Sequence, residues 1–66
     1  MQITVNGEIT EVEKNSSISD LLKQLNVTAP RVAVECNMNI IPKDDYQNTK
    51  IQPNDTIEIV AFVGGG

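Results

Sequence analysis

The chain has 66 residues, of which nine are acidic, five are basic and none is histidine, so its formal net charge is −4. That length fits one domain. A net negative charge without clustered Lys and Arg argues against nucleic-acid binding. The single cysteine, Cys36, has no second cysteine to pair with. The absence of histidine removes the commonest transition-metal ligand, so we expect no metal site. We also expect no bound cofactor.

The sequence shows no targeting or membrane segment. No stretch approaches the roughly 20 apolar residues that a membrane-spanning helix needs. Residues 1–5 lack the positive and apolar regions of a signal peptide. We therefore expect a cytoplasmic protein that is a monomer when free. The acidic surface either steers the chain toward a basic protein partner or only aids solubility.

The first elements are expected to form a hairpin. Alternating apolar and polar residues predict a strand over 2–6. Asn6-Gly7 favours a type I′ turn, because both residues tolerate positive φ. A returning strand is expected over 8–13, although Ile9 and Val12 would fall on opposite faces. Either Ile9 is partly exposed or a bulge intervenes.

One helix is expected next. Apolar residues recur at the i, i+3, i+4 and i+7 positions of a helical face: Ile18, Leu21, Leu22 and Leu25. Ser17 is a good N-cap, and Asp20 places a negative charge in the first turn. Asn26 is a plausible C-terminal stop. So short a helix is not stable alone, and its apolar face should pack against a sheet.

The second half of the chain carries mainly strand patterns. We expect a strand over 31–36, a turn over 37–39, a short strand at 40–41 before Pro42, a 3₁₀ turn near 44–46, a turn over 52–55 and a last strand over 56–63. The order β-β-α-β-β-β predicts an α+β fold in which a mixed sheet of four to five strands packs on one helix. That is the β-grasp, or ubiquitin-like, arrangement. It should span residues 1–63, with a flexible glycine tail over 64–66.

No side chain is a strong candidate for catalysis. Cys36 has no histidine to act as its base, and a strand cysteine is usually a small packed residue. The carboxylate pairs, Asp44 with Asp45 and Glu11 with Glu13, are expected to be solvated, so nothing raises their pKa for acid–base work. Catalysis by this chain alone is therefore not expected.

The three glycines at positions 64–66 are a different kind of candidate. Without Cβ atoms they can thread a narrow channel, and extended they reach about 10 Å beyond the sheet. They could deliver the carboxylate of Gly66 into a partner's active site. That ionised group is a poor electrophile and would need activation, for which adenylation by ATP is the obvious route. The plainer alternative is a frayed end without function.

The strand before the glycines offers a docking surface. Ile57, Ile59, Ala61 and Val63 are expected on one face of this strand, and Glu58, Val60 and Phe62 on the other. If the first face covers the helix, Val60 and Phe62 lie exposed beside the tail, as a partner-binding patch would. Alternatively, the sheet curls and Phe62 fills the end of the core.

Taken together, several motifs resemble a known family over the whole chain. The matching segments are Gln2-Ile3-Thr4-Val5-Asn6-Gly7, Ser19-Asp20-Leu21-Leu22, Val34-Glu35-Cys36-Asn37, Ile40-Ile41-Pro42-Lys43, Asp55-Thr56-Ile57-Glu58-Ile59-Val60 and Phe62-Val63-Gly64-Gly65-Gly66. In this order they resemble the ThiS-type sulfur carriers of thiamine biosynthesis. The chain departs from the family pattern at Asn54, where glycine is usual, and at Cys36, which replaces a variable residue.

The resemblance implies a mechanism. An E1-like adenylyltransferase would use ATP to adenylate the carboxylate of Gly66, and sulfur derived from a cysteine desulfurase would convert it to a thiocarboxylate. Thiazole synthase would then take the sulfur for the thiazole ring of thiamine. Gly64 and Gly65 would provide access, and Phe62, Val63 and Val60 would contact the partners.

Three alternatives remain open at this stage. The small subunit of molybdopterin synthase shares the fold, the Gly-Gly end and the sulfur chemistry. A ubiquitin-like modifier would instead join its C-terminus to a lysine. A pure binding module would keep its function without the last two glycines.

Overall fold

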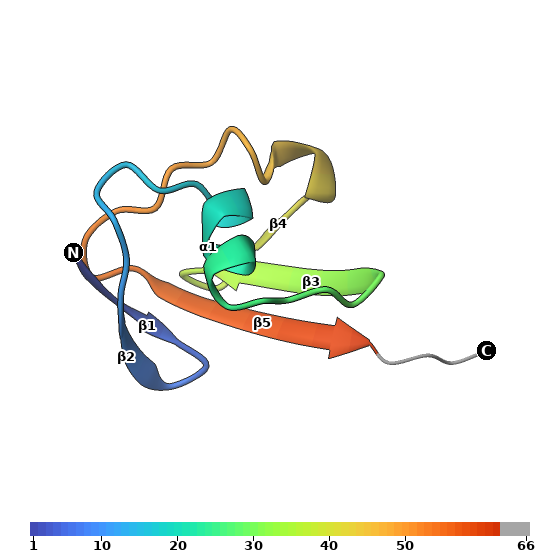
Figure 1. The fold of residues 1–66 in the computed structure, drawn as a ribbon, viewed down its shortest axis with the longest axis horizontal. Helices are drawn as coiled ribbons and strands as arrows, with labels where there is room; N and C mark the ends of the chain where they lie inside the picture. The colour runs from blue at the N-terminus through green and yellow to red at the C-terminus, as the bar shows by residue number, and fades with distance from the viewer. Residues whose placement is uncertain (63–66) are drawn as a thin grey trace.

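The computed structural model describes residues 1–62 (Figure 1). Its elements in chain order are β1 (Gln2–Val5), β2 (Glu8–Glu11), α1 (Ile18–Gln24), β3 (Arg31–Cys36), β4 (Asn39–Ile41), the 3₁₀ turn η1 (Lys43–Asp45) and β5 (Thr56–Phe62). The strands form one sheet in the order β2-β1-β5-β3-β4, in which β1 and β5 are parallel and the other neighbours antiparallel. With α1 lying across one face, this confirms the β-grasp fold. The expected boundary at 63–64 lies outside the described residues.

The first hairpin forms as the sequence predicts. Asn6 and Gly7 have φ values of 50° and 82°, the two positive angles of a type I′ turn. β2 ends at Glu11, earlier than expected, so Ile9 lies within the strand and Val12 lies outside it. Ile9 pairs with Thr4 and is 74% exposed on the sheet face away from the helix. Val12 lies beyond the end of β2 and is buried.

Helix α1 is short and capped at both ends. The Ser17 hydroxyl accepts from the Asp20 amide at 3.1 Å, and the Asp20 carboxylate accepts from the Ser17 amide at 3.0 Å, which forms a capping box. At the other end Asn26 has φ 56°, and the Val27 amide donates to the Leu22 oxygen at 2.9 Å. This is a Schellman ending with asparagine in the place usually held by glycine.

The core lies between the helix and the inner face of the sheet. Its buried residues are Ile3, Val5, Val12, Ile18, Leu21, Val34, Tyr46, Ile51 and Ile57. Leu22 packs against this cluster from its edge, but Leu25 is 38% exposed. The expectation that Leu25 packs on the sheet is wrong, because the helix ends at Gln24 and Leu25 already belongs to its cap.

Asparagine also shapes the later turns. Asn37 and Met38 carry positive φ values between β3 and β4, and Asn54 has φ 68° in the turn before β5. Asn54 follows Pro53, and the Asp55 amide donates back to the Gln52 oxygen at 3.2 Å. Because asparagine tolerates left-handed backbone better than most residues, it can stand where the family pattern has glycine.

Candidate functional site

Strand β5 lies at the centre of the sheet and leads toward the glycines at 64–66. Its two faces differ as the alternation predicts. Ile57 is fully buried under the helix, whereas Val60 and Phe62 on the other face are each 52% exposed. Phe62 does not belong to the core, which decides between the two readings of this residue. Val63 lies outside the described residues.

The last part of β5 projects beyond most of the sheet. Its pairing with β1 stops at Val5 with Ile57, and β4 pairs with β3 no further than Val34. By contrast, the β3–β5 register continues to Arg31 with Phe62. Residues 31–33 and 60–62 therefore form a two-stranded ribbon, seen in Figure 1 as the long arrows of β3 and β5. Ala61, expected to cover the helix, is exposed because the ribbon extends past it.

The side chain of Asn6 takes the place of a neighbouring strand at the base of this ribbon. Its Nδ2 donates to the Ile59 oxygen at 3.2 Å, and its Oδ1 accepts from the Ile59 amide at 2.7 Å. These bonds satisfy main-chain groups that β1 does not reach. Asn6 thus supports the part of β5 that leads into the candidate patch.

Tyr46 performs a similar role on the other edge of the ribbon. The phenol is buried, and its hydroxyl donates to the Val32 oxygen at 3.2 Å. β4 does not extend far enough to pair with Val32. The two edges of the ribbon are therefore stabilised by one side chain each, from residues far apart in the sequence.

Cys36 lies away from the ribbon tip and is part of a turn network. Its thiol donates to the Asp55 carboxylate at 3.6 Å, which also accepts from the Asn37 side chain at 3.0 Å. Burial, and then the negative charge of Asp55 and this hydrogen bond, raise the pKa of the Cys36 thiol. A raised pKa disfavours the nucleophilic thiolate, so the environment of Cys36 does not suit catalysis.

The carboxylates do not converge either. Within residues 1–62, no three His, Cys, Asp or Glu side chains lie close enough together to hold a metal ion. Glu11 forms an ion pair with the N-terminal amine at 3.6 Å, and Asp44 and Asp45 lie exposed in η1. In the same part of the chain, no helix is long and apolar enough to cross a membrane.

The remaining predicted site residues, Gly64, Gly65 and Gly66, also lie outside the described residues. What the structure adds is how the strand that precedes them is supported. Asn6, Tyr46 and Arg31 were not singled out from the sequence, although each contributes to the ribbon that precedes the glycines. The Asn6-Gly7 signal indicated only a turn, because nothing local to it points to Ile59.

The fold and the half-exposed patch at the end of β5 define a small β-grasp protein with one open sheet face. The match to a family model gives the more particular assignment: the model of the ThiS family covers residues 3–66. The chain belongs to the ThiS family. A crystal structure of a thiamine biosynthesis protein (ThiS) from Geobacter metallireducens superposes with a TM-score of 0.85, at 32% identity, with full coverage of both chains.

Two curated relatives show different lengths. The sulfur carrier protein ThiS of Bacillus subtilis is 38% identical over 65 residues, which cover 97% of this chain and 98% of that protein. A thiazole synthase of Paramagnetospirillum magneticum is 39% identical over 66 residues, which cover all of this chain and 20% of that protein. The chain therefore spans about a fifth of the length of the curated thiazole synthases it matches.

Proposed function

We propose that this chain is a sulfur carrier of thiamine biosynthesis, and that it holds sulfur as a thiocarboxylate on Gly66. The observation that carries the proposal is the similarity along the whole chain to a protein of the same length named as a sulfur carrier. The family match, which extends through residue 66, supports the inclusion of the glycines. Within residues 1–62 no three His, Cys, Asp or Glu side chains converge, which also favours chemistry on the main chain.

The chemistry begins with activation. The carboxylate of Gly66 attacks the α-phosphorus of ATP on an adenylating partner enzyme, which releases pyrophosphate and leaves an acyl adenylate. Hydrosulfide then attacks the acyl carbon, AMP leaves with the bonding electron pair, and loss of the proton from sulfur gives a thiocarboxylate. The chain contributes no catalytic side chain to these steps and is a co-substrate. Glycines without Cβ atoms suit passage through a narrow entry to the partner's active site.

Three kinds of partner follow from this scheme. They are an E1-like adenylyltransferase, a source of sulfur that begins with cysteine desulfurase, and thiazole synthase as the acceptor of the sulfur. Support for the last is the thiazole synthase in which a region similar to this chain makes up a fifth of the protein. We also propose that the protein acts in the cytoplasm, together with these enzymes and the ATP that the adenylyltransferase uses.

The partners would bind the chain at the apolar residues that precede the glycines. Val60 and Phe62 lie half-exposed on the outer face of β5, and Val63 follows them. Binding must offset the entropy lost when the following residues become ordered, at roughly 1–2 kcal/mol each. An apolar patch on a well-supported strand can provide that affinity without reorganising itself.

The deciding experiment is the intact mass of the protein after incubation with ATP, sodium sulfide and the candidate adenylyltransferase. A carrier should gain the mass difference between a sulfur and an oxygen atom. Omission of ATP and deletion of Gly65-Gly66 should each abolish the gain. A protein found joined to lysines of other proteins would be a modifier instead, and thiazole formation that survives the deletion would contradict the proposal.

The docking patch is tested separately with Phe62→Asp. We expect the adenylation rate at limiting protein concentration to fall about tenfold, since a hot-spot residue at the centre of an interface contributes more than about 1 kcal/mol. Ile9→Asp, on the same sheet face but two strands away, is the matched control and should react normally. Equal losses in both variants would show that the patch at the end of β5 has no special role.

A further inference from the structure

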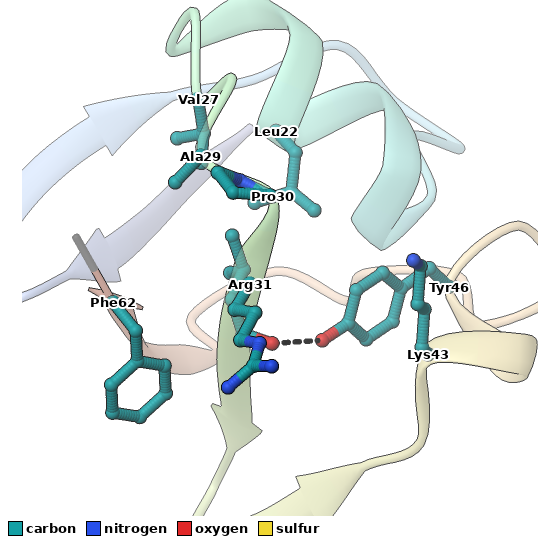
Figure 2. A pocket seen from close by; sticks show the side chains of 9 residues that line it. Leu22, Val27, Ala29, Pro30, Arg31, Lys43, Tyr46 and Phe62 are labelled. Carbon is teal, nitrogen blue, oxygen red and sulfur yellow. Dashed lines mark hydrogen bonds between the residues drawn. The ribbon is translucent and has the colours of Figure 1, made fainter. Parts of the chain in front are cut away.

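A groove of about 600 Å³ lies between the end of α1, the ribbon and η1 (Figure 2). Leu22, Val27 and Val32 are among its apolar residues, and Phe62 borders it where β5 ends. Two cations also line the groove: Arg31 at the start of β3 and Lys43 in η1. The groove therefore shares Phe62 with the proposed patch, while its other lining residues come from α1, the segment after it, β3, η1 and Tyr46.

Local structure holds the groove in shape. In the Schellman ending of α1 the Val27 amide donates to the Leu22 oxygen, which fixes these two residues relative to each other. On the opposite side, the Tyr46 hydroxyl binds the Val32 oxygen, a contact drawn as the dashed line in Figure 2. Because these contacts are made within the chain, a ligand would not have to order the groove first.

The charge of the groove is opposite to that of the molecule. The chain has nine acidic and five basic residues, yet two of the basic ones, Arg31 and Lys43, line the groove and no acidic residue among residues 1–62 does. Within residues 1–62, neither forms an ion pair. In Figure 2 the Arg31 side chain extends between Phe62 and Tyr46, and Lys43 lies beside Tyr46. Both cations border apolar surface.

We propose that this groove binds an acidic segment of a partner protein that presents one apolar side chain between two carboxylates. The apolar side chain would pack on Leu22, Val27 and Val32. One carboxylate would accept from the planar guanidinium of Arg31, and the other would pair with the ammonium group of Lys43. An apolar floor flanked by two cations from separate elements fits such a segment better than a small anion, which needs no floor.

The proposal extends the role of the ribbon tip. A partner segment in the groove would lie next to Phe62 and hold the chain just before residue 63. It would leave the outer sheet face, with Val60, available for a second contact. The inference rests on the groove and its charges and does not require the sulfur chemistry, so either proposal can fail while the other stands.

The test is a titration of the isotope-labelled protein with the acetylated, amidated tripeptide Glu-Leu-Glu, followed by amide chemical shifts. We expect saturable shifts at Val27, Arg31 and Val32, with little change at Ile9. The tripeptides Lys-Leu-Lys and Glu-Ser-Glu should each bind at least about tenfold more weakly, because each lacks one half of the recognised pattern.

Variants separate specific pairing from overall charge. Replacing Arg31 and Lys43 together by Glu should weaken Glu-Leu-Glu binding about tenfold or more, since two exposed ion pairs become repulsive. Replacing Lys14 and Lys50 together by Glu changes the net charge equally, and these residues do not line the groove, so binding should stay within about twofold. Equal losses in the two double variants would overturn the proposal.

Other occupants would give different results, and each would overturn it. Shifts of the groove residues on dilution without peptide would indicate a second copy of the chain. Shifts at the same residues on removal of residues 64–66, again without peptide, would indicate that the chain's own end occupies the groove. Peptide-induced shifts centred on Val60 and Ala33 would place binding on the outer face of the sheet.

Discussion

The two halves of β5 are built in different ways. Residues 56 and 57 pair with β1, the Asn6 side chain binds Ile59, and Ile57 has no exposed surface. Residues 60–62 have only β3 beside them, and Val60 and Phe62 are half-exposed. One strand therefore combines a segment that stabilises the domain with a segment that is free to bind. The predictions below test how sharply these roles divide, from the largest expected effect to the smallest.

Ile57→Ala should cause the largest loss of stability. It leaves a cavity in a fully buried position, at a cost of about 2–5 kcal/mol. A domain of this size has a free energy of unfolding of only about 3–10 kcal/mol, so a large fraction would be lost. Urea unfolding followed by circular dichroism measures this. A loss below about 1 kcal/mol would contradict the placement of Ile57 in the core.

Asn6→Ala tests the junction between the two halves. It removes both side-chain bonds to Ile59 and should lower the free energy of unfolding by about 1–2 kcal/mol. Hydrogen exchange of the Ile59 amide should also accelerate. Asn6→Gly is the matched control, because it removes the same bonds but relieves the positive φ. Unchanged Ile59 exchange in both variants would show that Asn6 does not support the strand.

Asp20→Asn tests the helix that covers the first half. Hydrogen bonds from the Ser17 amide and hydroxyl hold the pKa of Asp20 below its ordinary value of 3.8. Because the folded-state pKa is the lower one, this stabilisation is fully present above the ordinary pKa. It is lost as the pH falls through the folded value.

The measurement for Asp20 is the difference in free energy of unfolding between the wild type and Asp20→Asn across an acid titration. The wild type should be the more stable at neutral pH, and its advantage should shrink in the acid range. The effect should be smaller than that at Ile57, since the Asp20 carboxylate is fully exposed to solvent. An advantage that does not vary with pH would contradict the capping role of the ionised group.

Val60→Ser should have the smallest effect on stability. The side chain lies half-exposed on the outer face, and surface changes of this kind usually alter the free energy of unfolding by less than about 0.5 kcal/mol. The measurement is the thermal unfolding of Val60→Ser compared with that of Ile59→Ser, a substitution at the neighbouring residue on the inner face. A larger loss for Val60→Ser than for Ile59→Ser would reverse our assignment of the two faces.

Much of the fold follows from local signals. Asn6-Gly7 predicted the hairpin turn, Ser17 with Asp20 predicted the helix start, and the spacing of Ile18 and Leu21 predicted the buried face. Each of these depends on residues within a few positions of one another. The helix end was less well placed, because Leu25 continues the apolar pattern although the helix has already stopped.

The candidate site was predicted only in part. Alternation along β5 gave the exposure of Val60, but left the position of Phe62 open until the ribbon was seen to extend beyond the helix. The support from Asn6 could not be predicted, because Ile59 lies 53 residues away and pairs with it only when β1 and β5 become neighbours. The groove depends likewise on the meeting of β3, η1 and the end of α1.

The two hydrogen bonds between Asn6 and Ile59 also affect the susceptibility of Asn6 to deamidation. An asparagine before glycine is prone to deamidation, in which the glycine nitrogen attacks the side-chain carbonyl carbon and ammonia leaves. That attack requires the carboxamide to rotate away from its present partners, and here both of its polar atoms are bound to Ile59. The chemical lifetime of the first turn is therefore coupled to the integrity of the last strand.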